Sequence, residues 1–512
     1  MDRSIAHVLE RAAIQHGEHL ALAIGCDRFS YRQLNELANR FANALERVGV
    51  APGHRVSLYA PNSWQWIVSY YAVLKLGAVV NPLNAMLTAE EAKYAIEDCG
   101  ASLVVASADN ALALVESVGS ATNLQVVSFG PALPGALGFD AMIDRESAHF
   151  TIPAISPDAL STIAYTSGTT GHPKGAMLSH KAVLLNAAMT SVMHTRHAGD
   201  VVVTALPCAH AYGNIVMNAT FACGGTLVLH PTFAEHAVLE SIEQFGATLF
   251  EGVPTMYMSL LDVPQLKRYK LGSLQRCTVG GQTMPTAKIE QVEQAFGCPL
   301  IELWGMTELA GPATTQTLYG PRKRGSIGIP LPHVQARINV MPNCFASTLH
   351  PGIGELMIRG GLTMMGYYNN EDATAEVLTE DGWLRTGDLG HMDEDGFIFL
   401  IDRAKDLIVT DGCHIYPAEI ERVIAGHPAV AMVAVGTVKD AEKGELAKAY
   451  IVLAKGRTAS EAEIIAYCQA RLARDRLPRL VQFMADLPKT STGKIMRRAL
   501  EEAARQELAA SP

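Results

Sequence analysis

One loop in the sequence combines the residue types that bind an anion. It follows an apolar run, spans residues 163–175 and reads IAYTSGTTGHPKG, with three glycines, four Ser or Thr hydroxyls and one lysine. Glycine lets backbone amides approach an anion closely, hydroxyls donate hydrogen bonds, and the lysine adds a positive charge. The combination suits a di- or triphosphate. However, the spacing does not match the Walker A pattern, and a polar turn without a ligand has a similar composition.

The sequence around this loop alternates between helix and strand signals. Ser30 and Gln33 have the spacing of a capping box, as do Thr88 and Glu91, so each pair predicts the start of a helix. Short apolar runs predict buried strands at 56–59, 78–80 and 102–106. The alternation returns through residues 160–310 and predicts parallel sheets covered by helices.

The composition changes twice toward the C-terminal end. From about residue 325 to 402, short β-rich runs with Gly and Pro predict a small β-rich subdomain. Residues 403–512 carry 17 Lys and Arg against 14 Asp and Glu, a net charge of +3, whereas residues 1–402 carry a net charge of −13. This asymmetry fits a domain boundary near residue 402, although charged surface helices produce the same shift.

Length and composition exclude several classes of protein. The 512 residues are 49% hydrophobic and 18% charged, which is typical of a globular chain with a large core. The net charge of −10 argues against a nucleic-acid partner bound through a basic surface. Apolar runs stay shorter than the roughly 18 residues of a membrane span, and we see no secretory signal. Nine cysteines without a CxxC pair predict free thiols and a cytoplasmic location.

Five motifs follow one another in an order that resembles a known superfamily. They are the loop at 165–175, WGMTE at 304–308, RTGD at 385–388, DRAKD at 402–406 and KTSTGK at 489–494. Their order is similar to that of the adenylate-forming superfamily, which includes acyl-CoA ligases, luciferase-like enzymes and peptide-synthetase adenylation domains. The resemblance covers about residues 20 to 500 and points to the acyl-CoA synthetase, or fatty-acid–CoA ligase, branch.

This resemblance implies a fold and a reaction. The implied fold is α/β, with a large N-terminal adenylation domain over residues 1–402. That domain has two α/β sheet layers and a small β-barrel-like subdomain, and a small mobile α+β domain follows over residues 403–512. In the implied reaction a carboxylate attacks the α-phosphate of ATP, giving an acyl-adenylate and pyrophosphate. The thiol of coenzyme A then takes the acyl group and releases AMP, and Mg²⁺ is the expected cofactor.

The resemblance also assigns roles to individual residues. Four are expected to be catalytic: Lys494 in the adenylation transition state, Glu308 as the Mg²⁺ ligand, Thr307 at the α-phosphate and His210 beside the carboxylate. Lys405 is expected at the hinge of the mobile domain, and Gly412 at coenzyme A. The residues expected to bind ATP or AMP are Thr166, Ser167, Gly168, Thr169, Thr170, Lys174, Gly280, Gly281, Gln282, Trp304, Gly305, Met306, Asp388 and Arg403.

The acyl pocket is expected from the segments 206–217, 252–258, 279–282 and 305–314, which contain neither Lys nor Arg. Residues 208–217 also lack an acid, which disfavours an amino-acid substrate. We therefore expect an apolar monocarboxylic acid. Small residues are expected to leave volume for an aliphatic chain; they are Ala209, Ala211, Gly213 and Gly305. A medium- to long-chain fatty acid is therefore the first expected substrate, and an aryl acid fits as well. The expected pocket residues are His210, Ala211, Tyr212, Gly213 and Met217.

Other functions stay open at this stage. A ligase that loads an acyl-carrier protein typically carries an insertion before the hinge, for which the run from 387 to 402 leaves no room. A luciferase-like oxygenase shares all five motifs, and no residue excludes it. A non-catalytic nucleotide-binding protein is disfavoured by the intact Lys494, Glu308 and Asp388. The chain is also compatible with a homodimer.

Overall fold

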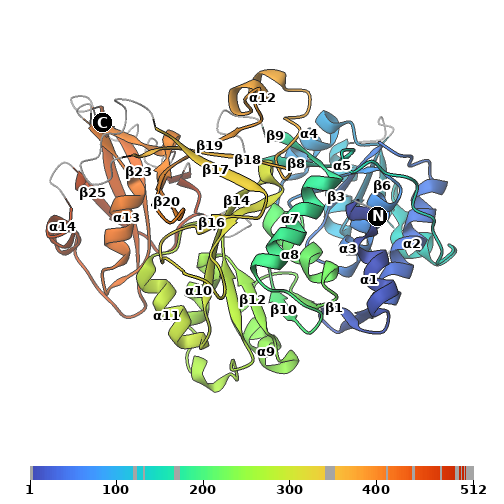
Figure 1. Ribbon diagram of the computed structural model, residues 1–512, viewed down its shortest axis with the longest axis horizontal. Helices are drawn as coiled ribbons and strands as arrows, with labels where there is room; N and C mark the ends of the chain where they lie inside the picture. Colours follow the sequence, from blue (N-terminus) through green and yellow to red (C-terminus); the bar gives the residue numbers. More distant parts are fainter. Residues whose placement is uncertain are drawn as a thin grey trace.

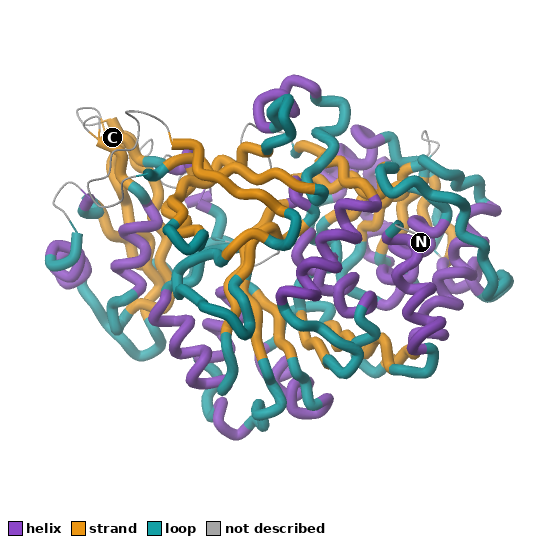
Figure 2. The backbone as a smooth tube through the Cα atoms, in the orientation of Figure 1, coloured by secondary structure: helices purple, strands orange, loops and turns teal. Residues whose placement is uncertain are grey.

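The computed structural model describes residues 4–118, 124–130, 133–166, 173–340, 352–410, 413–440, 444–472, 476–489, 495–497, 499–500 and 502. Within these residues the strands form four sheets. Figure 1 shows the helices of the N-terminal part at one end of the molecule and the last sheet at the other end. Figure 2 shows how helices surround the strands of the N-terminal part. The expected α/β fold class is confirmed.

The first large sheet has seven strands in the order β7-β6-β5-β3-β4-β8-β9. All neighbours run parallel except the last pair, β8 and β9, which form an antiparallel hairpin. The strands are β3 (Arg55–Tyr59), β4 (Val79–Leu83), β5 (Leu103–Ala106), β6 (Gln125–Ser128), β7 (Leu137–Gly138), β8 (Leu160–Thr166) and β9 (Lys174–Ser179).

The second large sheet has nine strands in the order β16-β15-β14-β13-β12-β10-β11-β1-β2. From β1 to β14 the neighbours are parallel, and the strands at the two edges are antiparallel. The strands are β1 (Leu20–Ile24), β2 (Asp27–Ser30), β10 (Val201–Thr204), β11 (Thr226–Leu229), β12 (Leu249–Gly252), β13 (Arg276–Val279), β14 (Leu300–Met306), β15 (Gly311–Thr315) and β16 (Ile329–Pro330).

Helices cover these two sheets, and both predicted capping boxes are confirmed at the starts of α2 and α4. The helices are α1 (Val8–His16), α2 (Tyr31–Arg47), α3 (Trp64–Lys75), α4 (Ala89–Cys99), α5 (Ala108–Val118), α6 (Phe139–Ile143), α7 (His180–Met193), α8 (Ala211–Ala222), α9 (Glu235–Phe245), α10 (Pro254–Leu261) and α11 (Thr286–Phe296). Short 3-10 turns are η1 (Ile5–His7), η2 (Leu266–Arg268) and η3 (Thr307–Leu309). Among the described helices, none combines the length and the apolar character needed to cross a membrane.

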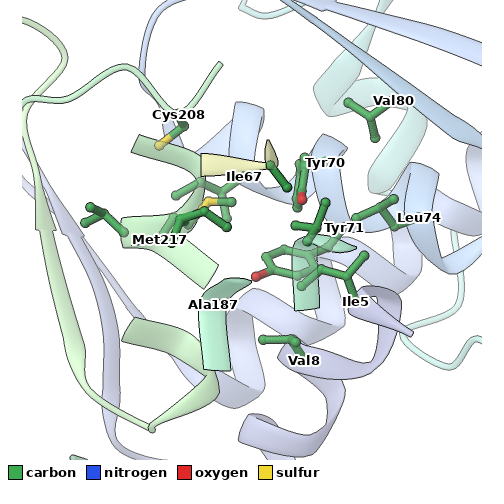
Figure 3. Close-up of a cluster of buried hydrophobic side chains, with 14 of the residues drawn as sticks. Ile5, Val8, Ile67, Tyr70, Tyr71, Leu74, Val80, Ala187, Cys208 and Met217 are labelled. Carbon is green, nitrogen blue, oxygen red and sulfur yellow. The ribbon is translucent and has the colours of Figure 1, made fainter. Parts of the chain in front are cut away.

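Two core clusters lie on opposite faces of the nine-stranded sheet. The larger cluster joins this sheet to the seven-stranded sheet through α1, α2, α3, α7 and α8, and part of it is drawn in Figure 3. The second cluster lies under α9, α10 and α11. Burying one face of α8 against the sheet therefore fixes the position of the residues at its N-terminal end.

The C-terminal part contains two smaller sheets. The expected β-rich subdomain is an antiparallel sheet of β17 (Val334–Val340), β18 (Gly354–Gly360), β19 (Leu384–Met392) and β20 (Ile398–Arg403), with α12 (Glu371–Val377) beside it. The last sheet has its own core. It contains β21 (Ile408–Thr410), β22 (Cys413–Ile415), β23 (Val430–Asp440), β24 (Gly444–Leu453) and β25 (Leu480–Phe483), and α13 (Pro417–Ala425), α14 (Glu461–Gln469) and the turn η4 (Ala404–Asp406) lie in the same stretch of chain.

Candidate active site

The ends of four neighbouring strands bring predicted residues to one edge of the nine-stranded sheet. β10, β12, β13 and β14 lie side by side and run parallel, so their carboxyl ends share that edge. They lead into the segments that begin at Ala205, Val253, Gly280 and Thr307. Ligands of open α/β sheets bind in the crevice outside the carboxyl ends of the strands. We therefore take this edge as the candidate active site.

Trp304, Asp388 and Arg403 form a hydrogen-bonded cluster. The indole Nε1–H of Trp304, on β14, donates to Oδ2 of Asp388 at 2.8 Å. Arg403 Nε lies 3.0 Å from the other oxygen, Oδ1, because β19 and β20 place the two residues opposite each other. Asp388 is only 5% exposed. The structure thus brings together three residues expected at the nucleoside, and it gives the Trp304 ring a polar contact that sequence analysis did not predict.

The expected phosphate loop connects two paired strands. Thr166 ends β8 and Lys174 begins β9, and these residues are partners in the antiparallel pair. The hydroxyl of Thr166 donates to the carbonyl oxygen of Lys174 at 3.4 Å. The two ends of the loop are therefore held side by side. Its remaining predicted phosphate ligands, Ser167, Gly168, Thr169 and Thr170, lie outside the described residues.

Tyr367 links Lys174 to Glu308, and sequence analysis did not single it out. Its hydroxyl donates to Oε1 of Glu308 at 2.8 Å, and Lys174 Nζ lies 5.3 Å from the centre of its ring. Burial, followed by the charge of Glu308, raises the pKa of Tyr367 above its usual range, so the hydroxyl stays protonated and donates. A Gly-Tyr-Tyr run at 366–368 was the available signal, but only the folded chain shows which tyrosine reaches the carboxylate.

The segment around Tyr367 joins the two large sheets at this point. The backbone N–H of Met364 donates to the carbonyl oxygen of Glu308 at 2.8 Å. On the other side, Met365 N–H donates to Met177 O at 2.8 Å, and Tyr368 N–H donates to Gly175 O at 2.8 Å. This double pairing fixes β9, and with it Lys174, relative to the turn η3 that carries Thr307 and Glu308.

Replacing Tyr367 with Phe tests this link. The variant keeps the ring under Lys174 and removes the hydrogen bond to the Glu308 carboxylate. A hydrogen bond to a charged group contributes about 1.5–3 kcal/mol, so we expect kcat/KM for ATP to fall about tenfold or more. Steady-state kinetics at several Mg²⁺ concentrations measure this. A Tyr368→Phe variant is the matched control, and equal losses in the two variants would argue against a special role for Tyr367.

Residues expected at the acyl pocket lie around the start of α8. His210 is exposed and caps the helix, with its Nδ1 accepting the Tyr212 N–H at 3.3 Å. Tyr212 and Met217 are buried, and Figure 3 shows Met217 in the same cluster as Cys208, Ile67 and Tyr70. Ala211 is partly exposed. The contacts of these residues with an acid stay predictions.

The expectation that Gly213 leaves volume for an aliphatic chain is wrong. Gly213 is buried, and a Cβ there would lie 2.2 Å from the carbonyl oxygen of Pro207, so two backbone segments already touch at this point. A Cβ at Gly305 would lie 2.1 Å from the carbonyl oxygen of Gly311, but Gly305 is exposed, and the volume expected beside it stays a prediction. A small residue in a sequence indicates free volume only where no backbone occupies it.

The remaining predicted residues are placed as follows. Gly280 and Gly281 follow β13, and Gly281 has a φ of +88°, which favours glycine. Gln282 comes next and is partly exposed, and Met306 ends β14 immediately before Thr307. Lys405 is the middle residue of η4, between the two smaller sheets. Gly412 and Lys494 lie outside the described residues.

Comparisons with known proteins agree with this arrangement. The family described as AMP-binding enzyme matches residues 9–368, and the AMP-binding enzyme C-terminal domain matches residues 419–494. The chain is 32% identical to a long-chain-fatty-acid–CoA ligase of Bacillus subtilis, covering 98% of this chain and 94% of that protein. It is 35% identical to an indoleacetate–CoA ligase of Aromatoleum aromaticum, covering 91% of each.

A solved structure leads to the same class. The fold superposes on the anthranilate CoA ligase AuaEII in complex with anthranoyl-AMP with a TM-score of 0.91 and 28% identity, covering 99% of this chain and 98% of that chain. The chain therefore belongs to the AMP-binding enzyme family, in the acyl-CoA synthetase branch of the adenylate-forming superfamily. It is an enzyme of the AMP-forming acid–CoA ligase class.

Proposed function

We propose that this enzyme activates an apolar monocarboxylic acid with ATP and transfers the acyl group to coenzyme A. The observation that carries the proposal is the position of β14 and the turn η3. Trp304 on β14 contacts Asp388 at 2.8 Å, and Glu308 in the turn accepts from Tyr367 at 2.8 Å. The residue proposed to contact the nucleoside, Trp304, and the residue proposed to act at the phosphates, Glu308, are therefore four residues apart in the chain. This spacing suits a single bound ATP.

The residues of the site supply what the first half-reaction needs. Asp388 is an acceptor for the ribose hydroxyls, and Arg403 holds the carboxylate in place. Lys174 and the hydroxyls of the loop 166–170 neutralise and bind the β- and γ-phosphates. Thr307 donates to the α-phosphate, where the carboxylate of the acid attacks and pyrophosphate leaves. His210 closes the site beside the acid.

A magnesium ion fits the chemistry of Glu308. Glu308 is 7% exposed, and its Oε1 accepts from Tyr367, which would hold the carboxylate in a fixed orientation for a cation. Within the described residues no group of three or more His, Cys, Asp or Glu forms a complete metal site. Mg²⁺ is commonly held by one or two carboxylates and takes its other oxygens from substrate phosphates and water. Bound there, it would offset the negative charge of the phosphates.

We assign the second half-reaction to a moving C-terminal domain, residues 403–512. Lys494 reaches the carboxylate and the α-phosphate during adenylation, and rotation about Lys405 then brings Gly412 toward coenzyme A. What supports this is that every strand of the last sheet follows η4 and that this sheet has a core of its own. A unit with its own core moves as one body about a short connection.

The acid is proposed as apolar because the expected pocket segments carry no cation for a second carboxylate. A medium- to long-chain fatty acid and an aryl acid both fit that description. Relatives with these substrates are known: a long-chain-fatty-acid–CoA ligase of Bacillus subtilis and an indoleacetate–CoA ligase of Aromatoleum aromaticum. The choice between them depends on the depth of the pocket.

A panel of acids tests the proposal. The full chain is incubated with ATP, Mg²⁺ and each acid, with and without coenzyme A, and AMP, ADP and pyrophosphate are measured. Over many turnovers we expect AMP and pyrophosphate in equal amounts, dependent on both the acid and coenzyme A, and without coenzyme A no more than about one equivalent of pyrophosphate per enzyme. Release of ADP would contradict the reaction. An adenylate that coenzyme A cannot discharge would favour a carrier-protein acceptor, and oxygen consumption with light emission would favour the luciferase-like alternative.

A further inference from the structure

A buried polar network lies between α8 and the nine-stranded sheet, beside the start of the expected acyl pocket. The hydroxyl of Tyr212 lies 2.7 Å from the hydroxyl of Thr278, which donates to Oε2 of Glu251 at 2.8 Å. Oε1 of Glu251 is paired with Arg196. The side chains of Arg196 and Glu251 are 1% and 0% exposed, so this ion pair is fully removed from water.

The strand register places the network at one level of the sheet. Glu251 on β12 and Thr278 on β13 are partners in the parallel pair, so their side chains point to the same face, toward α8. Thr204 on β10 extends the row, with its hydroxyl donating to the carbonyl oxygen of Glu251 at 2.8 Å. Each of these residues is the last or the last but one of its strand, so the row lies directly below the candidate site.

The same network holds α8 at two points. Tyr212 is in its first turn, and Thr220 is about two turns further on. Arg196 donates to the hydroxyl of Thr220 at 3.2 Å, while Glu251 reaches Tyr212 through Thr278. Burial keeps the pKa of Tyr212 well above its ordinary value, so its hydroxyl stays neutral and bonded. Between Tyr212 and Thr220, the face of α8 that packs on the nine-stranded sheet is therefore held against the sheet by polar contacts.

We propose that Tyr212, held by Thr278 and the Arg196–Glu251 pair, forms the closed end of the acyl pocket. The substrate is then a compact apolar acid, a short-chain or single-ring monocarboxylic acid, and not a long-chain fatty acid. This inference rests on the proposed function. A long alkyl chain would have to pass between α8 and the sheet, where it would displace the hydrogen bonds of the network and leave a buried charge unpaired.

Two glycines beside α8 support a short pocket. The space beside Gly213 is filled by the backbone of Pro207, and a Cβ at Gly311 would lie 2.7 Å from the side chain of Ile215. The volume that the sequence suggested at the start of α8 is therefore occupied by the protein itself. Thr278, Glu251 and Arg196 act as positioning residues, because they set where Tyr212 lies and have no proposed contact with the acid.

The chain-length profile of the unmodified enzyme is the first test. kcat/KM is compared for straight-chain acids from butyrate to hexadecanoate, together with benzoate and phenylacetate, by coenzyme A-dependent AMP formation. We expect the highest values for the shorter and single-ring acids and a fall of at least about tenfold by dodecanoate. Values that rise toward hexadecanoate would overturn the inference and leave the ligase function intact. Failure of every acid would overturn the proposed function and the inference together.

Variants then locate the closed end. Tyr212→Ala opens the pocket, and we expect the ratio of kcat/KM for dodecanoate to that for hexanoate to rise about tenfold. Thr278→Val keeps the size of the side chain and removes the hydroxyl between Tyr212 and Glu251, so the same ratio is expected to rise severalfold. If Tyr212→Ala does not fold, the chain-length ratio of Thr278→Val decides whether Tyr212 forms the closed end of the pocket. An unchanged ratio in Thr278→Val would contradict the positioning role.

Tyr31 offers a matched control. It is a fully buried tyrosine at the start of α2, and its hydroxyl donates to the backbone oxygen of Gly225. Neither residue lies in the segments expected to form the acyl pocket, so Tyr31→Ala is expected to lower the melting temperature without changing the chain-length ratio. A change in that ratio equal to the one in Tyr212→Ala would mean that general loosening of the core, and not the end of the pocket, sets the preference.

Discussion

Replacement of Asp388 with Ala is expected to weaken ATP binding about a hundredfold or more. The substitution removes the proposed acceptor for the ribose hydroxyls. It also leaves the indole N–H of Trp304 and the guanidinium of Arg403 without the partner that they share at 2.8 Å and 3.0 Å. Hydrogen bonds to a charged group contribute about 1.5–3 kcal/mol each. Losing the two proposed bonds from the ribose hydroxyls to Asp388 accounts for a loss of affinity of this size.

Titration calorimetry with ATP and with AMP measures the effect, and the melting temperature shows whether the fold survives. Asp381→Ala is the matched control, because Asp381 is an exposed carboxylate just before the same strand. Trp304→Phe separates the two contacts, since it keeps an aromatic ring for adenine and removes only the donor to Asp388. Equal ATP affinity in the Asp388→Ala variant and the unmodified enzyme would show that the cluster is structural only.

Replacement of Lys494 with Ala is expected to lower adenylate formation by a factor of about 10²–10³ or more. In our proposal this lysine neutralises charge that develops between the carboxylate and the α-phosphate, and a positioned group of this kind has an effect of that size. Transfer of the acyl group from a supplied acyl-adenylate to coenzyme A should be largely spared, because Lys494 is expected to act only in adenylation. Rapid-quench assays of the two half-reactions, run separately, measure this split.

A nearby lysine provides the control for that experiment. Lys489 begins the same motif and lies 2.7 Å from Asp486, where it forms a local ion pair. Lys489→Ala removes an equal charge and is expected to change both half-reactions little. Equal loss of adenylation and thioester formation in Lys494→Ala would contradict the assignment, as would an equal effect of the two substitutions on adenylation.

Local signals predicted much of the fold because they depend on residues close in sequence. The capping boxes at Ser30 and Thr88 specify their helices through side chains three residues apart, and both occur as expected. The apolar run before the loop 163–175 also indicated a strand, whereas the hairpin that this strand forms with β9 was not predicted. Strand order was not accessible in this way, because neighbours such as β1 and β11 lie about 200 residues apart in sequence.

The site was predicted in part, and its gaps have a common cause. Trp304, Asp388 and Arg403 were assigned by resemblance, and the structure adds how they contact one another. Tyr367 was missed because its role depends on Glu308, which is 59 residues away in the sequence. Gly213 was misjudged for the same reason, since the carbonyl of Pro207 that fills its space becomes visible only in the folded chain.

The Arg196–Glu251 pair is a further case of long-range pairing. Neither residue lies inside the segments expected to form the acyl pocket, yet the pair supports Tyr212 from below through Thr278. Charged residues are seldom fully buried unless paired, so only the pairing explains their presence under α8. In our proposal, substrate preference depends on contacts between strands that a single-sequence pattern does not reveal.

In the reaction that we propose, one site forms an acyl-adenylate and then passes the acyl group to coenzyme A. A single-turnover experiment tests it most directly, with excess enzyme, Mg²⁺, ATP and a radiolabelled compact acid such as hexanoate or benzoate. We predict that without coenzyme A the label accumulates as enzyme-bound acyl-AMP with one equivalent of pyrophosphate. Adding coenzyme A should convert it to acyl-CoA and AMP. Appearance of ADP and phosphate, or of acyl-CoA without a preceding acyl-AMP, would contradict the account.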